Sequence, residues 1–238
     1  MTSRTIMLAE LHLLLAALPA TATLGDYRTA IVEENVLLKR SATTRRATAR
    51  YLMELYTLDL RVPLFRVLRS LWDQDSVGRP LLASLCANAR DALLRRTAQA
   101  VLPLAPGTLI VPSDISRPIS ETTPNTYNAD TLARIARNAA SSWTQSGHLV
   151  GHRSKARARA QATTASAAYA LLLGFLAGAR GTFLLDTYWT SLLDVSADVL
   201  DTLAFDAGRH GWLTYRRIGD VVDLGFSDLL EGNKGVGA

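Results

Sequence analysis

Apolar residues recur every three or four positions through roughly the first hundred residues, a spacing that is typical of amphipathic helices. Helices are therefore expected over about residues 5–18, 26–39, 43–58, 63–74 and 80–102. Asp26 and Ser41 are suited to accept a hydrogen bond from an unpaired backbone N–H at a helix start, and Pro63 suits a first helical turn. We predict that residues 1–102 form an N-terminal helical module.

The helical pattern stops over residues 103–127. This stretch contains Pro103, Pro106, Pro112, Pro118 and Pro124. Proline lacks a backbone N–H and collides with the preceding helical turn, so no long helix is expected here. Residues 109–111 are apolar and β-prone enough for a short strand. The segment is predicted to be a proline-rich linker between two modules.

Helical spacing resumes after the prolines. Helices are expected over residues 130–145, 163–180, 182–193 and 196–209, with short strands over 148–152 and 212–215. The apolar run over 167–179 is shorter than the roughly 20 residues that cross a bilayer, which favours a buried helix over a membrane span. The predicted fold is mainly α. It has two helical modules, helix-turn-helix or winged-helix-like, and short β segments, and the second module, with a candidate wing, covers residues 128–238.

The charges are unevenly distributed, and this changes the functional picture. The net charge is +5, yet residues 131–185 contain no Asp or Glu, and neither do residues 35–53. After residue 185 acids outnumber bases. Two basic patches of this kind attract a polyanion, and DNA phosphate is a common one. A solvated basic face without a partner is the simpler alternative.

The compartment is predicted from the cysteine content and from the first residues. Cys86 is the single cysteine, so no internal disulfide can form and a reducing, cytoplasmic location is expected. The apolar stretch near the start is interrupted by Glu10 and His12, which argues against a signal peptide.

The helix expected over residues 130–145 has two different faces. Its apolar face carries Leu132, Ile135, Ala136, Ala139 and Trp143. Its polar face carries Arg134, Arg137, Asn138, Ser141 and Gln145, and no acid. Arg contacts guanine or phosphate, Asn and Gln contact adenine, and Ser contacts either kind of group. The polar face is therefore predicted to contact DNA, with Asn138, Ser141 and Gln145 as the base contacts.

The residues after this helix extend the prediction. A turn and a short strand lead into a basic loop that carries Arg153, Lys155, Arg157 and Arg159. Helix, turn, strand and basic loop follow one another in the order of a winged helix. In that arrangement the helix enters the major groove and the loop lies on the DNA backbone. The alternative is a surface helix followed by a basic loop with no ligand.

The helix expected over residues 43–58 carries a similar basic set, Arg45, Arg46 and Arg50. Glu54 shares the polar face, so phosphate contact is favoured over base contact. Residues 41–50 also align weakly with residues 128–137. This alignment indicates two related helical DNA-binding modules.

Residues 33–46, with the sequence EENVLLKRSATTRR, are the most distinctive stretch of the chain. Together with Ala49, Arg50, Tyr51 and Leu52, they resemble the BREX phage-defence protein A family. A second similar element combines Asp130, Thr131, Arg134 and Arg137 with Trp143 and residues 147–150. The resemblance implies a small, mostly helical, non-enzymatic accessory protein that binds double-stranded DNA in bacterial anti-phage defence, beside other defence-system proteins.

Motifs of catalysis and metal binding are missing from the sequence. It contains no glycine-rich phosphate loop, no His-Glu-x-x-His and no paired cysteines. His148 and His152 lack a third ligand, and Asp194, Asp198 and Asp201 suit a helix start better than a nuclease site. We expect no enzyme activity, cofactor, metal or membrane association. Two alternatives stay open: a protein-interaction scaffold whose basic face docks an acidic partner, and an RNA-binding helical module.

Overall fold

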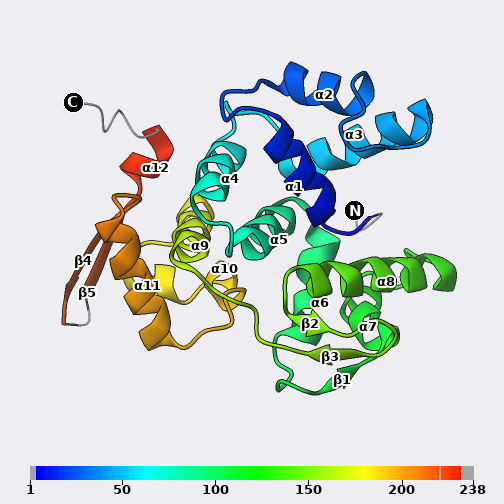
Figure 1. Ribbon diagram of the computed structural model, residues 1–238. Helices are drawn as coiled ribbons and strands as arrows, with labels where there is room; N and C mark the ends of the chain where they lie inside the picture. Colours follow the sequence, from blue (N-terminus) through cyan, green and yellow to red (C-terminus); the bar gives the residue numbers. More distant parts are fainter. Residues whose placement is uncertain (1–3, 220, 232–238) are drawn as a thin grey trace.

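The structure is a computed structural model that describes residues 4–219 and 221–231 (Figure 1). It is mainly helical with a few short antiparallel strands, which confirms the predicted fold class. The first five helices are α1 (Leu8–Ala17), α2 (Leu24–Val32), α3 (Ala42–Tyr56), α4 (Pro63–Gln74) and α5 (Arg79–Arg90). The glycine-containing tail at residues 234–238 lies outside the described residues.

The helix predicted to begin at Asp26 starts earlier and stops earlier. Thr23 is the N-cap of α2, its hydroxyl accepts a hydrogen bond from the backbone N–H of Asp26, and the Asp26 carboxylate accepts from the N–H of Thr23. The helix ends at Val32, and Asn35 and Leu38 then adopt left-handed backbone angles, which interrupt helical geometry.

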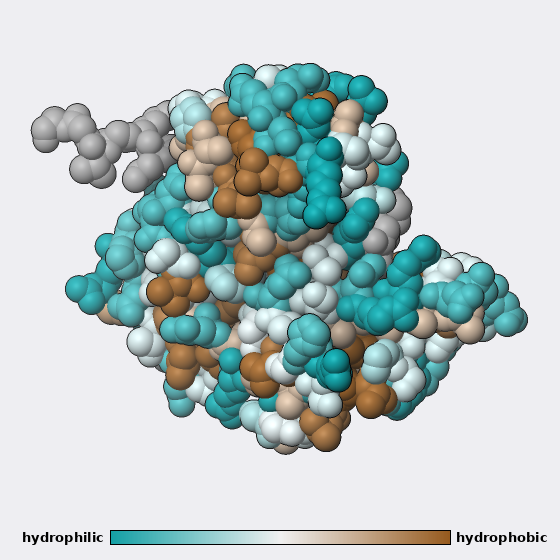
Figure 2. Space-filling view, turned by 45° about the vertical axis from the view of Figure 1, so that its right-hand side comes forward, coloured by the Kyte–Doolittle hydropathy of each residue, from teal (hydrophilic) through white to brown (hydrophobic). Residues whose placement is uncertain are grey.

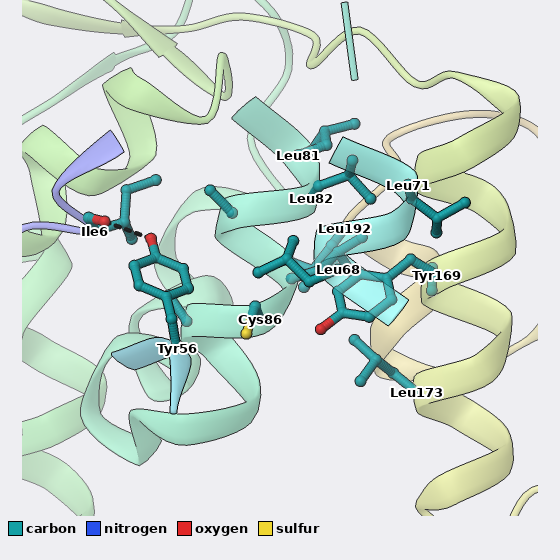
Figure 3. Close-up of a cluster of buried hydrophobic side chains, with 14 of the residues drawn as sticks. Ile6, Tyr56, Leu68, Leu71, Leu81, Leu82, Cys86, Tyr169, Leu173 and Leu192 are labelled. Atoms are coloured by element: carbon teal, nitrogen blue, oxygen red, sulfur yellow. Dashed lines mark hydrogen bonds between the residues drawn. The ribbon is translucent and has the colours of Figure 1, made fainter. Parts of the chain in front are cut away.

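Helix α9 (Thr164–Leu176) occupies the middle of the fold and packs against α4 and α5. Its residues 165–174 are all buried, which confirms the prediction of a buried helix for most of the apolar run over 167–179, but the helix ends at Leu176 and residues 176–178 are exposed. Figure 3 shows Tyr169 and Leu173 of this helix facing Leu68 and Leu71 of α4. Among the described residues, no helix is both long enough and apolar enough to cross a membrane.

Cys86 lies in the same core, beside Tyr56 and Tyr169 (Figure 3). Burial raises the pKa of its thiol to about 12. The thiol is therefore protonated and unreactive at neutral pH, as expected of a cysteine that serves as a small buried hydrophobic residue.

The helix predicted over residues 80–102 is two helices. Helix α5 ends at Arg90, and α6 (Ala92–Val101) begins directly after Asp91. The Asp91 carboxylate accepts hydrogen bonds from the backbone N–H groups of Leu93 and Leu94, at 3.0 and 3.2 Å. The chain therefore turns at an N-cap that lies within a continuous helical pattern.

The linker prediction for residues 103–127 is wrong, because this segment folds into a strand and a helix. Strand β1 (Leu109–Ile110) is followed by α7 (Pro112–Thr122), which packs between α6 and α8 (Ala129–Gln145). Pro112 occupies the first helical turn, where its missing N–H costs nothing. Pro118 removes one internal hydrogen bond, and the burial of Ile115 and Ile119 beside it offsets that loss.

Residues 92–157 together have the connectivity of a winged helix. Helix α6, strand β1, helices α7 and α8, strand β2 (Leu149–Val150) and strand β3 (Lys155–Arg157) follow in that order. The sheet is antiparallel with the strand order β1-β3-β2. The turn at residues 151–154 lies in the region predicted to carry a wing, but residues 155–157 of the predicted basic loop form β3. The unit also includes the segment expected to be a linker.

The last part of the chain packs around α9. It contains the 3₁₀ helix η1 (Gly181–Leu185), α10 (Tyr188–Ser191), α11 (Ala197–Arg209), β4 (Thr214–Ile218), β5 (Val221–Gly225) and α12 (Ser227–Glu231). The helix predicted over 182–193 is thus two short pieces. The strand expected over 212–215 is longer and pairs with β5 in a hairpin that projects from the fold (Figure 1).

Candidate nucleic-acid interface

Helix α8 is held so that one face is fixed in the core and the other is exposed. Its N-cap Asn128 accepts a hydrogen bond from the backbone N–H of Thr131 at 2.9 Å. On the inner face, the indole N–H of Trp143 donates to the hydroxyl of Thr97 in α6 at 2.8 Å. Arg134 and Arg137 lie on the opposite, exposed face.

The turn between β2 and β3 places basic residues against this helix. Gly151 has a φ of 98°, and a Cβ at this position would collide with the carbonyl oxygen of Ser154. Only glycine fits such a turn without strain. The turn carries His152 and Arg153 on the exposed surface, and the Lys155 ammonium that follows donates to the carbonyl of Gly151 at 2.7 Å.

A cleft of about 410 Å³ lies between α7, α8 and this turn. We call it the basic cleft; it is lined by Ile110, Pro112, Ile115, Arg137, Ala140, Ser141, His152, Arg153 and Lys155. Four of the predicted DNA-contacting residues thus meet in one place, although they come from two separate segments. Among the residues that the structure describes, no carboxylate lines the cleft.

Arg134 and Arg137 have no acidic partner in the described chain, unlike seven other arginines that form ion pairs. Within the described part of the chain, no carboxylate lies within ion-pair distance of Arg134, Arg137 or Arg153. Their positive charges are therefore available to an external anion.

Arg157 is a correction to the predicted set, because its side chain is buried. Its guanidinium forms an ion pair with Asp194 at 2.9 Å and donates to the backbone carbonyls of His148 and Ala158. The side chain is 2% exposed, so it has no access to DNA. Its role is structural, because it ties the winged-helix unit to the segment that precedes α11.

Gln145 is a second correction. Its side-chain oxygen accepts a hydrogen bond from the backbone N–H of Leu8 at 3.0 Å, and its amide donates to the hydroxyl of Ser141 at 3.4 Å. The last turn of α8 is thus used to hold the start of α1. Asn138 and Ser141 are half-buried, and Arg159 is exposed beyond the end of β3.

Two of the three arginines of α3 have intramolecular partners. Arg45 donates to the carbonyl of Val32 at 2.8 Å and so satisfies the end of α2. Arg50 stacks on the ring of Tyr51 at 4.8 Å and lies 3.8 Å from the Glu54 carboxylate. Arg46 is exposed.

The two predicted basic helices project toward the same side of the molecule, with the beginning of α1 between them (Figure 1). Figure 2 turns this side forward, and hydrophilic residues predominate over its right-hand part. The basic residues that line the cleft, however, come from α8 and from the turn and strand after it, and none come from α3.

The candidate metal and carboxylate sites do not assemble. Burial lowers the pKa of His148 to about 4, and its ring contacts the hydroxyl of Ser146 and the carbonyl of Leu192. Asp194 is paired with Arg157, whereas Asp201 contacts Tyr215 and Arg217 in another part of the fold. The described residues contain no group of three or more His, Cys, Asp or Glu side chains that could hold a metal.

Sequence reasoning missed the apolar part of the cleft. Ile110, Pro112 and Ile115 come from the segment that was predicted to be a linker. The one feature of the sequence that pointed to these residues was the apolar run at the expected short strand. His152 was considered as a metal ligand and instead lines the cleft.

No protein-family model, curated protein or solved structure matches this chain significantly. The likeness of residues 33–46 to the BREX family therefore stays a prediction.

Proposed function

We propose that this protein binds double-stranded DNA through its winged-helix unit, residues 92–157. Helix α8 would enter the major groove with Arg134 and Arg137, and the turn that carries Arg153 would lie on the adjacent backbone. The observation that supports this most is the combination of winged-helix connectivity with unpaired arginines on the exposed face of α8.

Most of the binding free energy would come from phosphate contacts. Arg134, Arg137 and Arg153 would each displace counterions from the DNA, so affinity should fall steeply as salt rises. Asn138 is the remaining candidate for a base contact with the duplex, because it shares this helix face, whereas Ser141 lines the basic cleft. Arg157 and Gln145 are not part of the proposed interface.

The proposed biological role is that of a non-enzymatic accessory protein in a BREX-like anti-phage defence system. It would dock on duplex DNA and meet other defence proteins, with the acidic region after residue 185 as the candidate contact. This wider role rests on the family resemblance and on the charge distribution. Cross-linking in cells that express such a system should join this region to another component of it, and recovery of no such product would overturn the recruitment step.

The test of DNA binding is fluorescence anisotropy of the protein with a labelled duplex over a series of salt concentrations. The Arg134→Ala/Arg137→Ala variant should bind about 100-fold more weakly, and its salt slope should be lower by about 1 per arginine removed. The Arg61→Ala/Arg209→Ala variant is the matched control, because it removes two exposed arginines that are paired with Asp59 and Asp206 elsewhere.

The control variant should lose at most about threefold in affinity, through the general loss of positive charge. Equal weakening of both variants would mean that net charge alone controls binding. No binding at low salt would overturn the proposal, and the basic face would then be assigned to an acidic protein partner.

A further inference from the structure

The basic cleft combines two surfaces that the backbone of a continuous duplex does not use together. Its rim is cationic, with Arg137, Arg153 and Lys155. Its apolar lining consists of Ile110, Pro112, Ile115 and Ala140; Pro112 is exposed and the other three are buried. A phosphodiester would gain nothing from contact with the apolar lining, and an apolar ligand would gain nothing from contact with the cationic rim.

The volume of the cleft limits the size of a ligand that can contact both its cationic rim and its apolar lining. A volume of about 410 Å³ lies toward the lower end of the range of small-molecule sites. The occupant must therefore be compact, with a flat weakly polar part and an anionic part. A single nucleotide has this chemistry, because its base has apolar faces and its phosphate is anionic.

A base that is stacked and paired inside a duplex is held away from such a cleft by its neighbours. An unpaired base has no such restraint, and removing it from the stack costs least where it is already single-stranded. The position of the cleft beside α8, between that helix and the wing, would bring an unpaired nucleotide within reach when the unit sits on DNA.

We propose that the basic cleft takes one unpaired nucleotide of the bound DNA. This inference rests on the proposed function. The base would lie against Pro112, which is the exposed apolar residue of the lining, and the phosphate would be bound by Arg137 and Arg153. The half-buried hydroxyl of Ser141 lies on the wall and would meet the polar edge of the base. The protein would thus prefer DNA that carries an unpaired nucleotide, whether at a single-stranded end or as an internal bulge.

The test compares three labelled DNAs of the same sequence by anisotropy at one salt concentration. They are a blunt duplex, the duplex with a 5′-phosphorylated overhang, and the duplex closed by hairpins at both ends and carrying one internal unpaired nucleotide. Binding should be about tenfold tighter to one or both of the last two. Preference for the overhang alone identifies a DNA end as the source, and preference for both identifies any unpaired base. A free deoxynucleoside 5′-monophosphate should compete with the excess binding only.

The Ser141→Leu variant fills the cleft without a change of charge. It should bind the blunt duplex within about twofold of the unchanged protein and lose the preference for unpaired nucleotides. Ser191→Leu is the matched control, because Ser191 is exposed on α10 and lies outside the cleft. Both variants are checked for an unchanged melting temperature. If Ser141→Leu does not fold, Arg153→Ala replaces it, and its affinity for the preferred DNA should fall more than its affinity for the blunt duplex.

Failure of this inference and failure of DNA binding give different results. Equal affinity for all three DNAs, or a preference that survives Ser141→Leu, overturns the inference and leaves duplex binding intact. Absence of binding to every DNA overturns the proposed function as well.

Discussion

Helices α3 and α8 begin in the same way and are used differently. Each starts one residue after a polar N-cap, Ser41 or Asn128, whose side chain accepts a hydrogen bond from the backbone N–H three residues later. The alignment of residues 41–50 with residues 128–137 therefore reflects a shared capping geometry, which is local. The surroundings differ, because α8 is followed by a strand and a wing whereas α3 leads into α4.

The arginines show what this difference means. Arg45 satisfies the end of α2, and Arg50 is stacked on Tyr51 beside Glu54. Arg134 and Arg137 have no carboxylate partner in the described chain, and Arg137 faces the basic cleft. Basic residues on a helix thus indicate a binding face only where the fold provides no internal partner for them.

The largest expected effect is a loss of stability when an arginine of the winged-helix unit is replaced. Arg157→Ala should lower the free energy of unfolding by about 4 kcal/mol, because it leaves Asp194 without its partner and removes bonds to buried carbonyls. Arg45→Ala, the matched change beside α3, should cost about 1 kcal/mol. Urea denaturation measures both, and equal losses would contradict the division of roles between the two regions.

His148 should make the winged-helix unit sensitive to acid. Its pKa is lowered from about 6.5 in the unfolded chain to about 4 by burial, so the unfolded state binds the proton first as pH falls. The stability that this residue contributes is full above pH 6.5 and declines between pH 6.5 and 4, by about 3 kcal/mol in all.

The measurement for His148 is the unfolding free energy as a function of pH for the unchanged protein and for His148→Gln. The variant should lack this part of the pH dependence, while carboxylates still contribute at lower pH. His152→Gln is the control for the loss of a histidine, because His152 is exposed. Superimposable slopes for His148→Gln and the unchanged protein would show that the residue does not titrate in this way.

The two N-caps should be equivalent. Ser41→Ala and Asn128→Ala should each destabilise the protein by about 1 kcal/mol, because each leaves a helix N–H without its acceptor. Asn128→Asp should retain most of the stability, since the carboxylate also accepts this bond. Thermal unfolding gives the comparison, and a large difference between the two alanine variants would argue against the shared local geometry.

The smallest expected effect concerns DNA binding by α3. Arg46→Ala/Arg50→Ala should weaken duplex binding about threefold, through the general loss of positive charge. The same anisotropy assay with Arg134→Ala/Arg137→Ala provides the scale. A loss as large as that of the α8 variant would place α3 in the interface and restore the prediction of two DNA-binding modules.

The sequence allowed prediction of helices whose ends are marked by caps and whose faces are clearly amphipathic. The predictions from the sequence were wrong where a polar residue or a proline is compatible with two different local structures. Asp91 continues the helical pattern yet caps a new helix, and Pro112 breaks one helix yet begins another. The basic segment after residue 152 was predicted to be a loop, but its residues 155–157 form strand β3. Periodicity also did not distinguish the exposed Arg153 from the buried Arg157.

The sequence by itself determined the helical character, the buried nature of α9 and the concentration of positive charge over residues 131–185. These depend on periodicity and composition, which are local properties of the chain. Only the tertiary structure decided which charges face outward. Burial and pairing depend on residues far away in sequence, such as Asp194 for Arg157 and Leu8 for Gln145. The basic cleft is of this kind, because its walls come from segments that meet only after the chain has folded.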